Sequence, residues 1–470
     1  MKKVSLFVMM LTLVSVTAVG QSFMLDFPNM NSETSVVRHC PNFSNCVILY
    51  SYASGDTTNH FSFVDLNNNI ARSAPFVQGA VVNDVELVGD LAFFCGTMNG
   101  KALFGYFDIS PLVLGSGTVD YLYTDLNSLI FTYDFSSSTT AYYTEAFKLA
   151  LYNYGSNQHA FIVTNLTLAG SNTTYSAVID LCCDMSYLPT MWKHYSYNAI
   201  TTAERFCDVA ATNNYVAFVG RSTNSNDAYL HIVRKQPVAT NLFAPGPSYI
   251  DSTFSYSFTF PNVISDPIIE ACDPNNDDNI AIAFYNQDHS GFNTNVVTLS
   301  ADVPPIGHPN ITRQNHNKES FGSNNNSNKK MYELLHIQNL SYHFLVHYAP
   351  ESNASNTSRI DEYGNADNIA SVNALYKPQY TFNSVDQISN SSYIVSGKIA
   401  DVHNYGTQCL YVHEFNNNGC ISSATKQVSY EQTQWSESYR FGNYSGTNFF
   451  VLQKKSIPLY NIRIERSCTH

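Results

Sequence analysis

Two stretches of the sequence, Asn83–Gly96 (NDVELVGDLAFFCG) and Cys207–Gly220 (CDVAATNNYVAFVG), match one another position by position. Each has aspartate at its second position, then a short segment, a polar turn and an apolar run that ends in glycine. A polar hairpin leads from each into a second apolar segment, Ala102–Asp108 in one copy and Ala228–Arg234 in the other. Short apolar or alternating runs bounded by turn residues are typical of β-strands. The repeated kernel is therefore a pair of adjacent strands.

This two-strand kernel occurs eight times along the chain. Its first strands begin near Val47, Ala92, Ala160, Val216, Ala281, Phe344, Tyr393 and Phe449. Its second strands are Phe61–Asp65, Ala102–Asp108, Tyr175–Asp180, Ala228–Arg234, Asn295–Leu299, Ser358–Tyr363, Cys409–Phe415 and Tyr460–Glu465. One small sheet cannot bury its faces alone, so such repeats indicate blades stacked around an axis. We predict an all-β fold, a β-propeller of seven or eight four-stranded blades, with seven if the first and last copies share a blade.

A circular fold has to join its ends. We therefore expect Tyr460–Glu465 to pair with strands in Cys40–Asp65 or with Phe23–Phe27. Two longer segments, Ser110–Tyr143 and Val303–Lys330, interrupt the repeat pattern and are expected to be exposed loops. They would form either rims over a ligand-binding face or ordinary solvent-facing loops.

The N-terminus has the zones of a cleavable export signal. Two lysines precede the apolar run Val4–Val16, and Ala18–Gly20 supplies the small residues of a cleavage site. The run is shorter than the roughly 20 apolar residues that a membrane anchor needs. We therefore expect residues 1–20 to be a signal peptide and residues 21–470 to form one propeller domain. The protein is expected in the periplasm, at the cell surface or outside the cell.

The charge balance excludes two classes of partner. Residues 1–20 contain two lysines and no acidic residue, so the rest of the chain carries 22 basic and 37 acidic side chains, a net charge near −15. Nucleic acids and anionic lipid surfaces bind basic patches. We expect neither as a partner and no membrane insertion, because no later segment is apolar enough to span a bilayer. A protein or a glycan is the expected ligand, and the oligomeric state stays open.

The ten cysteines of an exported chain are expected to be mostly paired. Cys40 and Cys46 flank one short turn, and Cys409 and Cys420 flank the end of one strand and its turn. We predict these two disulfides and leave the other pairings open. A small buried thiol is the alternative for Cys40 and for the cysteines at its repeat position. No Cys-x-x-Cys motif supports structural zinc or disulfide exchange.

Recognised catalytic motifs are absent. The chain has no Gly-x-Ser-x-Gly elbow, no His-Glu-x-x-His zinc motif and no phosphate-binding Gly-Lys-Ser/Thr loop. His343 and His347 have the spacing of a helical metal pair, but on a strand they lie roughly 13 Å apart and cannot share an ion. Cys272–Asn279 resembles a calcium loop, although Phe284 occupies the place of the bidentate glutamate. We therefore predict no cofactor, with calcium at this otherwise ordinary polar turn as the alternative.

One set of polar residues stands about eight positions before the first strands of the kernels. Its members are His39, Asp84, Tyr152, Asp208, Asp273, His336 and Asp386, the last beside the counted Val385. If this position opens the innermost strand, the side chains surround the central channel and form a ligand-binding site. Carboxylates gathered there raise one another's pKa values and can bind a cation or a hydroxyl-rich ligand. The alternative is that each aspartate only stabilises a turn by bonding its own backbone.

In its repeat form the mature chain resembles the broad β-propeller superfamily over nearly its whole length. It lacks the Trp-Asp ending of the best-known repeats, the paired glycines of kelch repeats and the Ser-x-Asp-x-Gly-x-Thr-Trp boxes of sialidases. The export signal without a lipidated cysteine, the Asn-, Tyr- and Ser-rich composition and the divergent repeats are similar in style to uncharacterised secreted propellers of gut-type bacteria. The resemblance therefore implies a fold and assigns no functional residue.

Two functions of different class are compatible with these observations. The absence of a catalytic motif favours an exported non-catalytic binding or scaffold protein that recognises a glycan, peptide or protein partner. The alternative is a secreted glycan-active hydrolase or lyase that uses two carboxylates at the propeller centre as acid and as base or nucleophile. Catalysis is left open, and no residue is assigned a catalytic role.

Overall fold

A computed structural model gives the structure of the chain. It describes residues 22–25, 31–43, 46–54, 59–65, 70–77, 79–115, 119–126, 141–154, 157–168, 174–184, 192–196, 203–235, 250–272, 277–288, 291–302, 310–320, 330–337, 342–348, 358–363, 372–376, 380–389, 392–400, 406–415, 421–424, 429–431, 442–444, 447–452 and 460–463. The expected signal peptide, residues 1–20, lies outside these ranges and stays a prediction.

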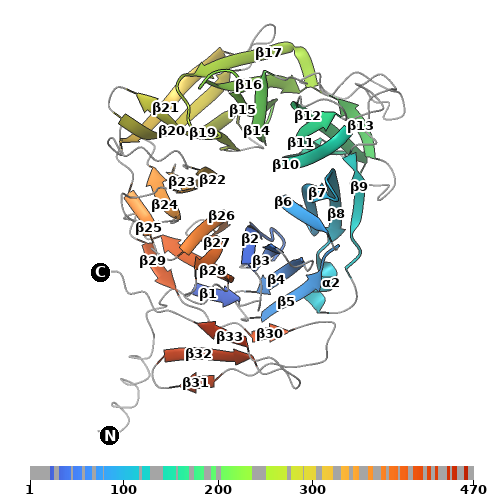
Figure 1. Cartoon of the computed structure of the whole chain (residues 1–470), viewed down its shortest axis with the longest axis vertical. Coiled ribbons are helices and arrows are strands. Elements are labelled where there is room, and N and C mark those ends of the chain that lie inside the picture. The colour runs from blue at the N-terminus through green and yellow to red at the C-terminus, as the bar shows by residue number, and fades with distance from the viewer. Residues whose placement is uncertain are drawn as a thin grey trace, which may run out of the picture.

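The described chain is nearly all β-structure, and seven of its sheets are arranged around a common centre (Figure 1). The first sheet contains β2 (Asn31–His39), β3 (Cys46–Ser54), β4 (His60–Asp65) and β5 (Ile70–Pro75), with β30 (Ser429–Glu431) parallel to β5. The second contains β6 (Ala80–Val88), β7 (Leu91–Met98), β8 (Lys101–Asp108) and β9 (Leu122–Asp125). The third contains β10 (Ala141–Tyr154), β11 (Asn157–Leu168), β12 (Thr174–Asp184) and β13 (Trp192–Ser196).

The remaining sheets continue in chain order. The fourth contains β14 (Glu204–Ala211), β15 (Tyr215–Ser222), β16 (Ala228–Lys235) and β17 (Ile250–Phe260). The fifth contains β18 (Ile268–Ala271), β19 (Asn279–Asp288), β20 (Gly291–Asp302) and β21 (Asn310–Ser320). The sixth contains β22 (Lys330–Ile337), β23 (Tyr342–Tyr348), β24 (Ser358–Tyr363) and β25 (Val372–Tyr376). The seventh contains β26 (Tyr380–Ser389), β27 (Ser392–Ala400) and β28 (Gly406–Phe415), with β1 (Ser22–Leu25) and β29 (Ile421–Ala424) both paired to β28.

The predicted kernels are the second and third strands of these sheets. Every predicted first strand falls on the second strand of a sheet, and every predicted second strand falls on the third. The eighth kernel differs, because β32 (Thr447–Leu452) and β33 (Tyr460–Arg463) form a three-stranded sheet with β31 (Gly442–Tyr444), drawn outside the other seven (Figure 1). The all-β, propeller-like prediction is therefore confirmed at the level of repeated antiparallel sheets.

Two expectations about connections are wrong. Tyr460–Arg463 pairs with β32 rather than with the N-terminal region, and the strand that joins the seventh sheet from the N-terminus is β1. The segments expected to be loops contain β9 and β21, the outer strands of the second and fifth sheets. The first also contains helix α2 (Ser110–Leu114), which ends at Gly115 with a φ of 66°, a value that suits glycine. Outer strands carry few apolar residues, so their sequences resemble those of exposed loops.

The glycine that ends the kernel has a structural reason. Gly96 on β7 lies opposite a bulge in β6 between Val82 and Asp84, and a Cβ at Gly96 would come within 1.9 Å of the Val81 carbonyl oxygen. Gly220 on β15 lies opposite the matching bulge in β14. A bulge bends its strand and re-aims the side chains that follow it. The aspartate of the repeated motif stands immediately after each bulge, which fixes its direction.

The apolar core is divided among the interfaces between neighbouring sheets. One buried cluster joins the first sheet to the second, where the Phe61 and Phe107 rings lie 4.6 Å apart. Separate clusters join the second sheet to the third, the third to the fourth, the fourth to the fifth and the fifth to the sixth. Each fully buried large apolar side chain contributes about 1.5 to 3 kcal/mol. Each interface is thus a thin core of its own. The innermost strand of each sheet, which precedes the kernel, faces the middle of the arrangement (Figure 1).

The structure does not form the predicted Cys40–Cys46 disulfide. Cys40 is a free thiol, and both cysteines lie in the apolar cluster between the first two sheets. The Cys40 amide donates to the Cys46 carbonyl at 2.8 Å, so a backbone hydrogen bond closes this turn. Burial raises the pKa of the Cys40 thiol. Cys409 lies on β28, whereas Cys420 is outside the described residues, so that disulfide stays a prediction.

Buried histidines form polar contacts between and within sheets. The His347 Nε2 on β23 lies 2.6 Å from Asp361 Oδ2 on β24, and the His347 ring also contacts the Tyr285 hydroxyl of the fifth sheet. His343 lies 3.1 Å from the Thr298 hydroxyl and 3.3 Å from the His336 ring. The two histidines of β23 therefore have separate partners, as the strand prediction requires. In the part of the chain that the structure describes, no helix has the length and apolar character to cross a bilayer.

We predict that Cys40 and Cys95 are unreactive thiols in the folded protein. Both are buried and free, and burial raises the pKa of each, which suppresses the nucleophilic thiolate. Maleimide labelling with peptide mapping should modify neither residue in native buffer and both in denaturant without reductant. A mapped Cys40–Cys46 bridge in protein purified without reductant would contradict this.

We predict that His343 weakens the fold on acidification. Burial, and then the nearby His336, lowers the pKa of His343 to about 3, whereas an unfolded histidine titrates near 6.5. The unfolded state therefore binds a proton that the folded state does not, so the stability contribution present above pH 6.5 is lost as the pH falls toward 3. The free energy of unfolding should fall more steeply between pH 6.5 and 4 in the wild type than in His343→Gln.

The comparison of the wild type with His343→Gln is necessary because Asp208 and Asp386 also titrate in this pH range. Their pKa values are raised to about 6, so their contribution runs in the opposite direction, with stability falling as the pH rises from about 4 to 6. Both aspartates are present in the wild type and in the variant, so the difference between the two curves isolates His343. Parallel curves in urea melts would show that His343 is not held neutral.

Candidate functional site

Each of the seven innermost strands contributes a charged side chain to the middle of the sheet arrangement. These residues are Arg38 on β2, Asp84 and Glu86 on β6, Lys148 on β10, Asp208 on β14, Glu270 on β18, Glu333 on β22 and Asp386 on β26. Six are acidic and two are basic, so the group has excess negative charge. This central charged group is built from strands that are up to some 350 positions apart in sequence.

Four of the carboxylates connect one innermost strand to the backbone of the next. The Leu149 amide donates to Asp84 Oδ2 at 3.1 Å, and the Ile269 amide donates to Asp208 Oδ2 at 3.0 Å. The remaining two connections are Val385 N to Glu333 Oε2 at 2.8 Å and His39 N to Asp386 Oδ2 at 2.5 Å. Asp84 and Asp208 also accept from their own following amides, those of Val85 and Val209. Asp84 and Asp208 therefore bond their own backbone, as a turn-stabilising aspartate does, and also lie at the centre of the sheet arrangement.

Arg38 is the positive centre of the group. It is only 8% exposed, and its guanidinium donates to Asp84 Oδ1 at 2.9 Å and pairs with Glu333 Oε1 at 2.7 Å. It also donates to the Val37 carbonyl and the Ser384 hydroxyl, and its Nε lies 3.6 Å from Glu86 Oε1. A guanidinium has five N–H donors. Those of Arg38 are directed at groups of the protein itself.

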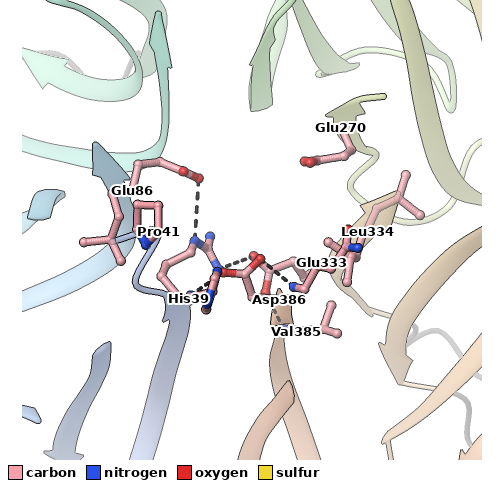
Figure 2. Close-up of a pocket in the computed structure, with 12 residues that line it drawn as sticks. His39, Pro41, Glu86, Glu270, Glu333, Leu334, Val385 and Asp386 are labelled. Carbon is pink, nitrogen blue, oxygen red and sulfur yellow. Dashed lines mark hydrogen bonds and ion pairs between the residues drawn. The ribbon is translucent and has the colours of Figure 1, made fainter. Parts of the chain in front are cut away.

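A cavity of about 240 Å³ opens beside Arg38. Its polar lining comes from Arg38, His39, Glu86, Glu270, Glu333, Asp386 and Gln387. Figure 2 shows Glu86, Glu270 and Asp386 directed toward the same space from three different strands. The volume is below the roughly 300 to 1,000 Å³ of pockets for drug-sized ligands. It suits a small group or the end of a longer molecule.

Burial shifts several of these acids toward their neutral forms. Loss of hydration raises the pKa of Glu270 well above its ordinary value, and the charges of Glu86 and Glu333 raise it further. Partial loss of hydration raises the pKa of Glu86 to about 8, although its side chain keeps 37% exposure, while Arg38 beside it opposes the rise. For Asp386, burial raises the pKa to about 6 against the opposing effects of Arg38 and two backbone amides. With a pKa raised to about 8 for Glu86 and to about 6 for Asp386, the cavity holds acids in different protonation states at pH 7, and the pKa of Glu270 shifts in the same direction.

Two groups at the cavity are left without hydrogen-bond partners. Among the residues that the structure describes, the Glu270 carboxylate has no hydrogen-bond or ion-pair partner. The buried Nε2 of His39 is likewise unpaired within the described chain, and burial lowers the pKa of this histidine. Buried polar groups are normally satisfied. Of the two, the Glu270 carboxylate lines the cavity and is available to a ligand, whereas the His39 Nε2 is enclosed by the protein.

The predicted ring residues are only partly brought together. Asp84, Asp208, Asp386 and His39 belong to the central charged group or line its cavity. Tyr152 instead packs against the apolar cluster between the third and fourth sheets, and His336 contacts His343. Asp273 lies outside the described residues. The fixed offset of eight residues is therefore wrong for part of the set.

The offset of eight residues fails because the turn that joins the innermost strand to the next strand differs in length from sheet to sheet. Only two residues separate β6 from β7, whereas six separate β2 from β3. Counting from strand pairing instead places Arg38, Glu86 and Asp386 at one equivalent position, opposite Ile48, Phe93 and Ile394. Sequence reasoning missed Arg38, Glu86, Lys148, Glu270 and Glu333. The signal that marks these residues is a charged side chain inside the segment that precedes each kernel and forms the innermost strand.

The possible calcium turn is described only in part. Asp277 accepts from the Asn279 amide at 3.0 Å, and Asp278 accepts from Thr212 and Asn214 of the fourth sheet. Both carboxylates thus serve the turn and its contact with a neighbouring sheet. Within the described ranges, no group of three or more His, Cys, Asp or Glu side chains has the arrangement of a metal site. Calcium binding stays a prediction.

No protein-family model and no curated protein matches the sequence. Among solved structures, the fold is similar to a Mycobacterium tuberculosis puromycin-hydrolysing peptidase, with 6% identity, a TM-score of 0.47, and coverage of 93% of this chain and 59% of that one. It is similar to a prolyl endopeptidase, with 7% identity, a TM-score of 0.45, and coverage of 84% and 49%. It is also similar to an oligogalacturonate lyase in complex with manganese, with 8% identity, a TM-score of 0.42, and coverage of 86% and 99%. The chain thus spans about half to three fifths of the two peptidases.

The expectation of a non-catalytic binding or scaffold protein is contradicted by these comparisons. The similar structures are mostly of catalytic enzymes, and glycosidases are among them. At identities of 6 to 8%, however, the likeness concerns the fold and transfers neither substrate nor catalytic residue. Any reaction has to follow from the side chains of the cavity.

We predict that Asp84→Ala destabilises the protein by about 3 kcal/mol or more. The substitution leaves the buried Arg38 with less compensating charge and removes the bond to the Leu149 amide. The matched control is Glu86→Gln, because Glu86 lies 3.6 Å from the same guanidinium but its side chain keeps 37% exposure. That variant should stay within about 1 kcal/mol of the wild type. Equal losses for both in urea melts would contradict a structural role specific to Asp84.

Proposed function

We propose that this protein is a glycan-active hydrolase whose active site is the cavity beside Arg38. The observation that carries the proposal is the meeting, around one small cavity, of carboxylates whose pKa values are raised by different amounts, foremost Glu270 and Asp386. Cleavage of a glycosidic bond requires one carboxylic acid to protonate the leaving oxygen and one carboxylate as base or nucleophile. A pair whose environments separate their pKa values meets this requirement.

Glu270 is assigned as the general acid. Its pKa is raised by burial and by neighbouring acids, it has no partner in the described chain, and it projects into the cavity (Figure 2). Asp386 is assigned as the base or nucleophile. With a pKa raised to about 6 it is ionised at neutral pH, and the His39 and Gln387 amides hold it in place. Arg38 limits the repulsion between the acids.

The lining favours hydrolysis of glycans over other reactions. None of the described lining residues is serine, threonine or cysteine, so the cavity offers no nucleophile for a peptidase of those classes. Elimination by a lyase acts on sugars that carry a carboxylate, and binding that group calls for a free cation. The guanidinium of Arg38 is occupied by the protein's own carboxylates. A neutral or cationic sugar fits better.

The fold and location assigned here complete the proposal. We infer that the seven sheets are the blades of a seven-bladed propeller, because their innermost strands contact one another in order and β26 lies against β2. The pairing of β1 with β28 supports joining of the ends. The export signal favours action on glycans outside the cytoplasm.

We predict that Glu270→Gln and Asp386→Asn each lower kcat by about a hundredfold or more on oligosaccharides that the wild type cleaves. The wild-type rate should fall below pH of about 6, where Asp386 becomes protonated and can no longer act as base. Reducing-end assays over a panel of oligosaccharides from pH 4 to 9 measure both effects.

Asp227→Asn is the matched control. Asp227 is a half-buried carboxylate in the hairpin between β15 and β16, remote from the cavity lining, where it accepts from the Ser225 hydroxyl. This variant should keep the wild-type rate. Full activity in both cavity variants, or a pH profile without the fall near 6, would refute the assignment. So would the absence of cleavage across the panel.

A further inference from the structure

The cavity is rich in hydrogen-bond acceptors and poor in free donors. The carboxyl groups of Glu86, Glu333 and Asp386 present their oxygens as acceptors. The main donor, Arg38, directs its N–H groups at Asp84, Glu333, Ser384 and Val37. A ligand that fits such a lining brings donors of its own.

The charge of the lining points in the same direction. When Glu270 is protonated for catalysis and Glu86 is protonated in the empty cavity, Glu333 and Asp386 still stand against the single cation Arg38. Lys148 does not alter this balance at the cavity, because it lies on β10, 3.9 Å from Asp84, and is not part of the lining. His39 contributes no charge near neutral pH, since burial lowers its pKa. The uncompensated charge is negative.

Glu86 is the lining acid best placed to bind a ligand group. It is held only by the 3.6 Å approach to Arg38, and its side chain keeps 37% exposure, whereas Glu333 is bound both by Arg38 and by the Val385 amide. Figure 2 shows Glu86 on the side of the cavity opposite Glu270, so a group bound at Glu86 leaves the catalytic acid its proton. Glu86 is therefore a candidate for specificity rather than for bond cleavage.

We infer that the cavity binds the free primary amine of an amino sugar, with Glu86 as the residue that selects it. An ammonium group carries three N–H donors, one positive charge and no acceptor. It therefore complements the acceptor oxygens and the negative charge of the lining. A charge-assisted hydrogen bond to a carboxylate is about twice as strong as a neutral one. Acetylation of the amine removes the charge, and a uronate adds a charge of the wrong sign. This assignment rests on the proposed hydrolase function for the choice of a sugar as ligand.

Binding of an ammonium should also release a proton. The positive charge favours the ionised form of Glu86, whose pKa is raised in the empty cavity by burial. Titration calorimetry in two buffers of different ionisation enthalpy would detect the released proton, which a purely steric pocket would not produce.

The test compares oligosaccharides of one length and linkage. Isothermal titration of the full-length Asp386→Asn variant, which binds without turnover, would use oligomers of glucosamine, of N-acetylglucosamine and of galacturonic acid. We expect the glucosamine oligomer to bind about tenfold more tightly than its acetylated counterpart and the uronide to bind least. Glu86→Gln in the same background should bring the first two affinities close to one another. Thermal melts check that each variant is folded.

Each outcome bears on the inference. Equal affinity for the amine and the acetylated oligomer, or tighter binding of the uronide, overturns it. A preference that survives Glu86→Gln overturns the role of Glu86. Tighter binding of a lysine oligopeptide of equal charge would overturn the sugar as ligand. If the amine is preferred but the wild type cleaves none of the oligomers, the hydrolase proposal fails while the amine site stands.

Discussion

The structure depends on carboxylates that reach from one innermost strand to the backbone amide of the next. Asp84 and Asp208 do so immediately after a bulge, and Glu333 and Asp386 do so from the sixth and seventh sheets. These bonds satisfy backbone groups at the centre, where sheets that pack only through thin apolar interfaces would otherwise leave them exposed. The cost is a concentration of negative charge, which Arg38 and Lys148 offset only in part.

That residual charge connects the architecture to the chemistry. Carboxylates that are both buried and close together cannot all ionise, so some are held protonated near neutral pH while others, fixed by backbone amides, stay charged. At one cavity, the pKa of Glu270 is raised well above its ordinary value, whereas Asp386, with a pKa of about 6, is ionised at pH 7. The same physical feature that fastens the innermost strands thus supplies an acid and a base without a recognised sequence motif.

The sequence predicted the paired strands well because their apolar runs face two packed interfaces, as in Phe93–Cys95 and Phe344–Val346. It failed for β9 and β21, whose outer positions need few apolar residues. At the site it found Asp84 and Asp208, because the bulge and its opposing glycine repeat in the sequence. It could not find Glu270 or Arg38, since register across turns of different length is decided by strand pairing.

The central claim is that a carboxylic acid stays protonated at neutral pH inside this cavity beside ionised neighbours. Infrared titration of the carboxyl stretching bands, with labelled glutamate and with Glu270→Gln as the reference, observes this proton directly. The account predicts a protonated glutamate band at pH 7 that loses intensity in Glu270→Gln, with the remainder assigned to Glu86, whose pKa is raised to about 8. A spectrum in which every glutamate is ionised at pH 7 would contradict it.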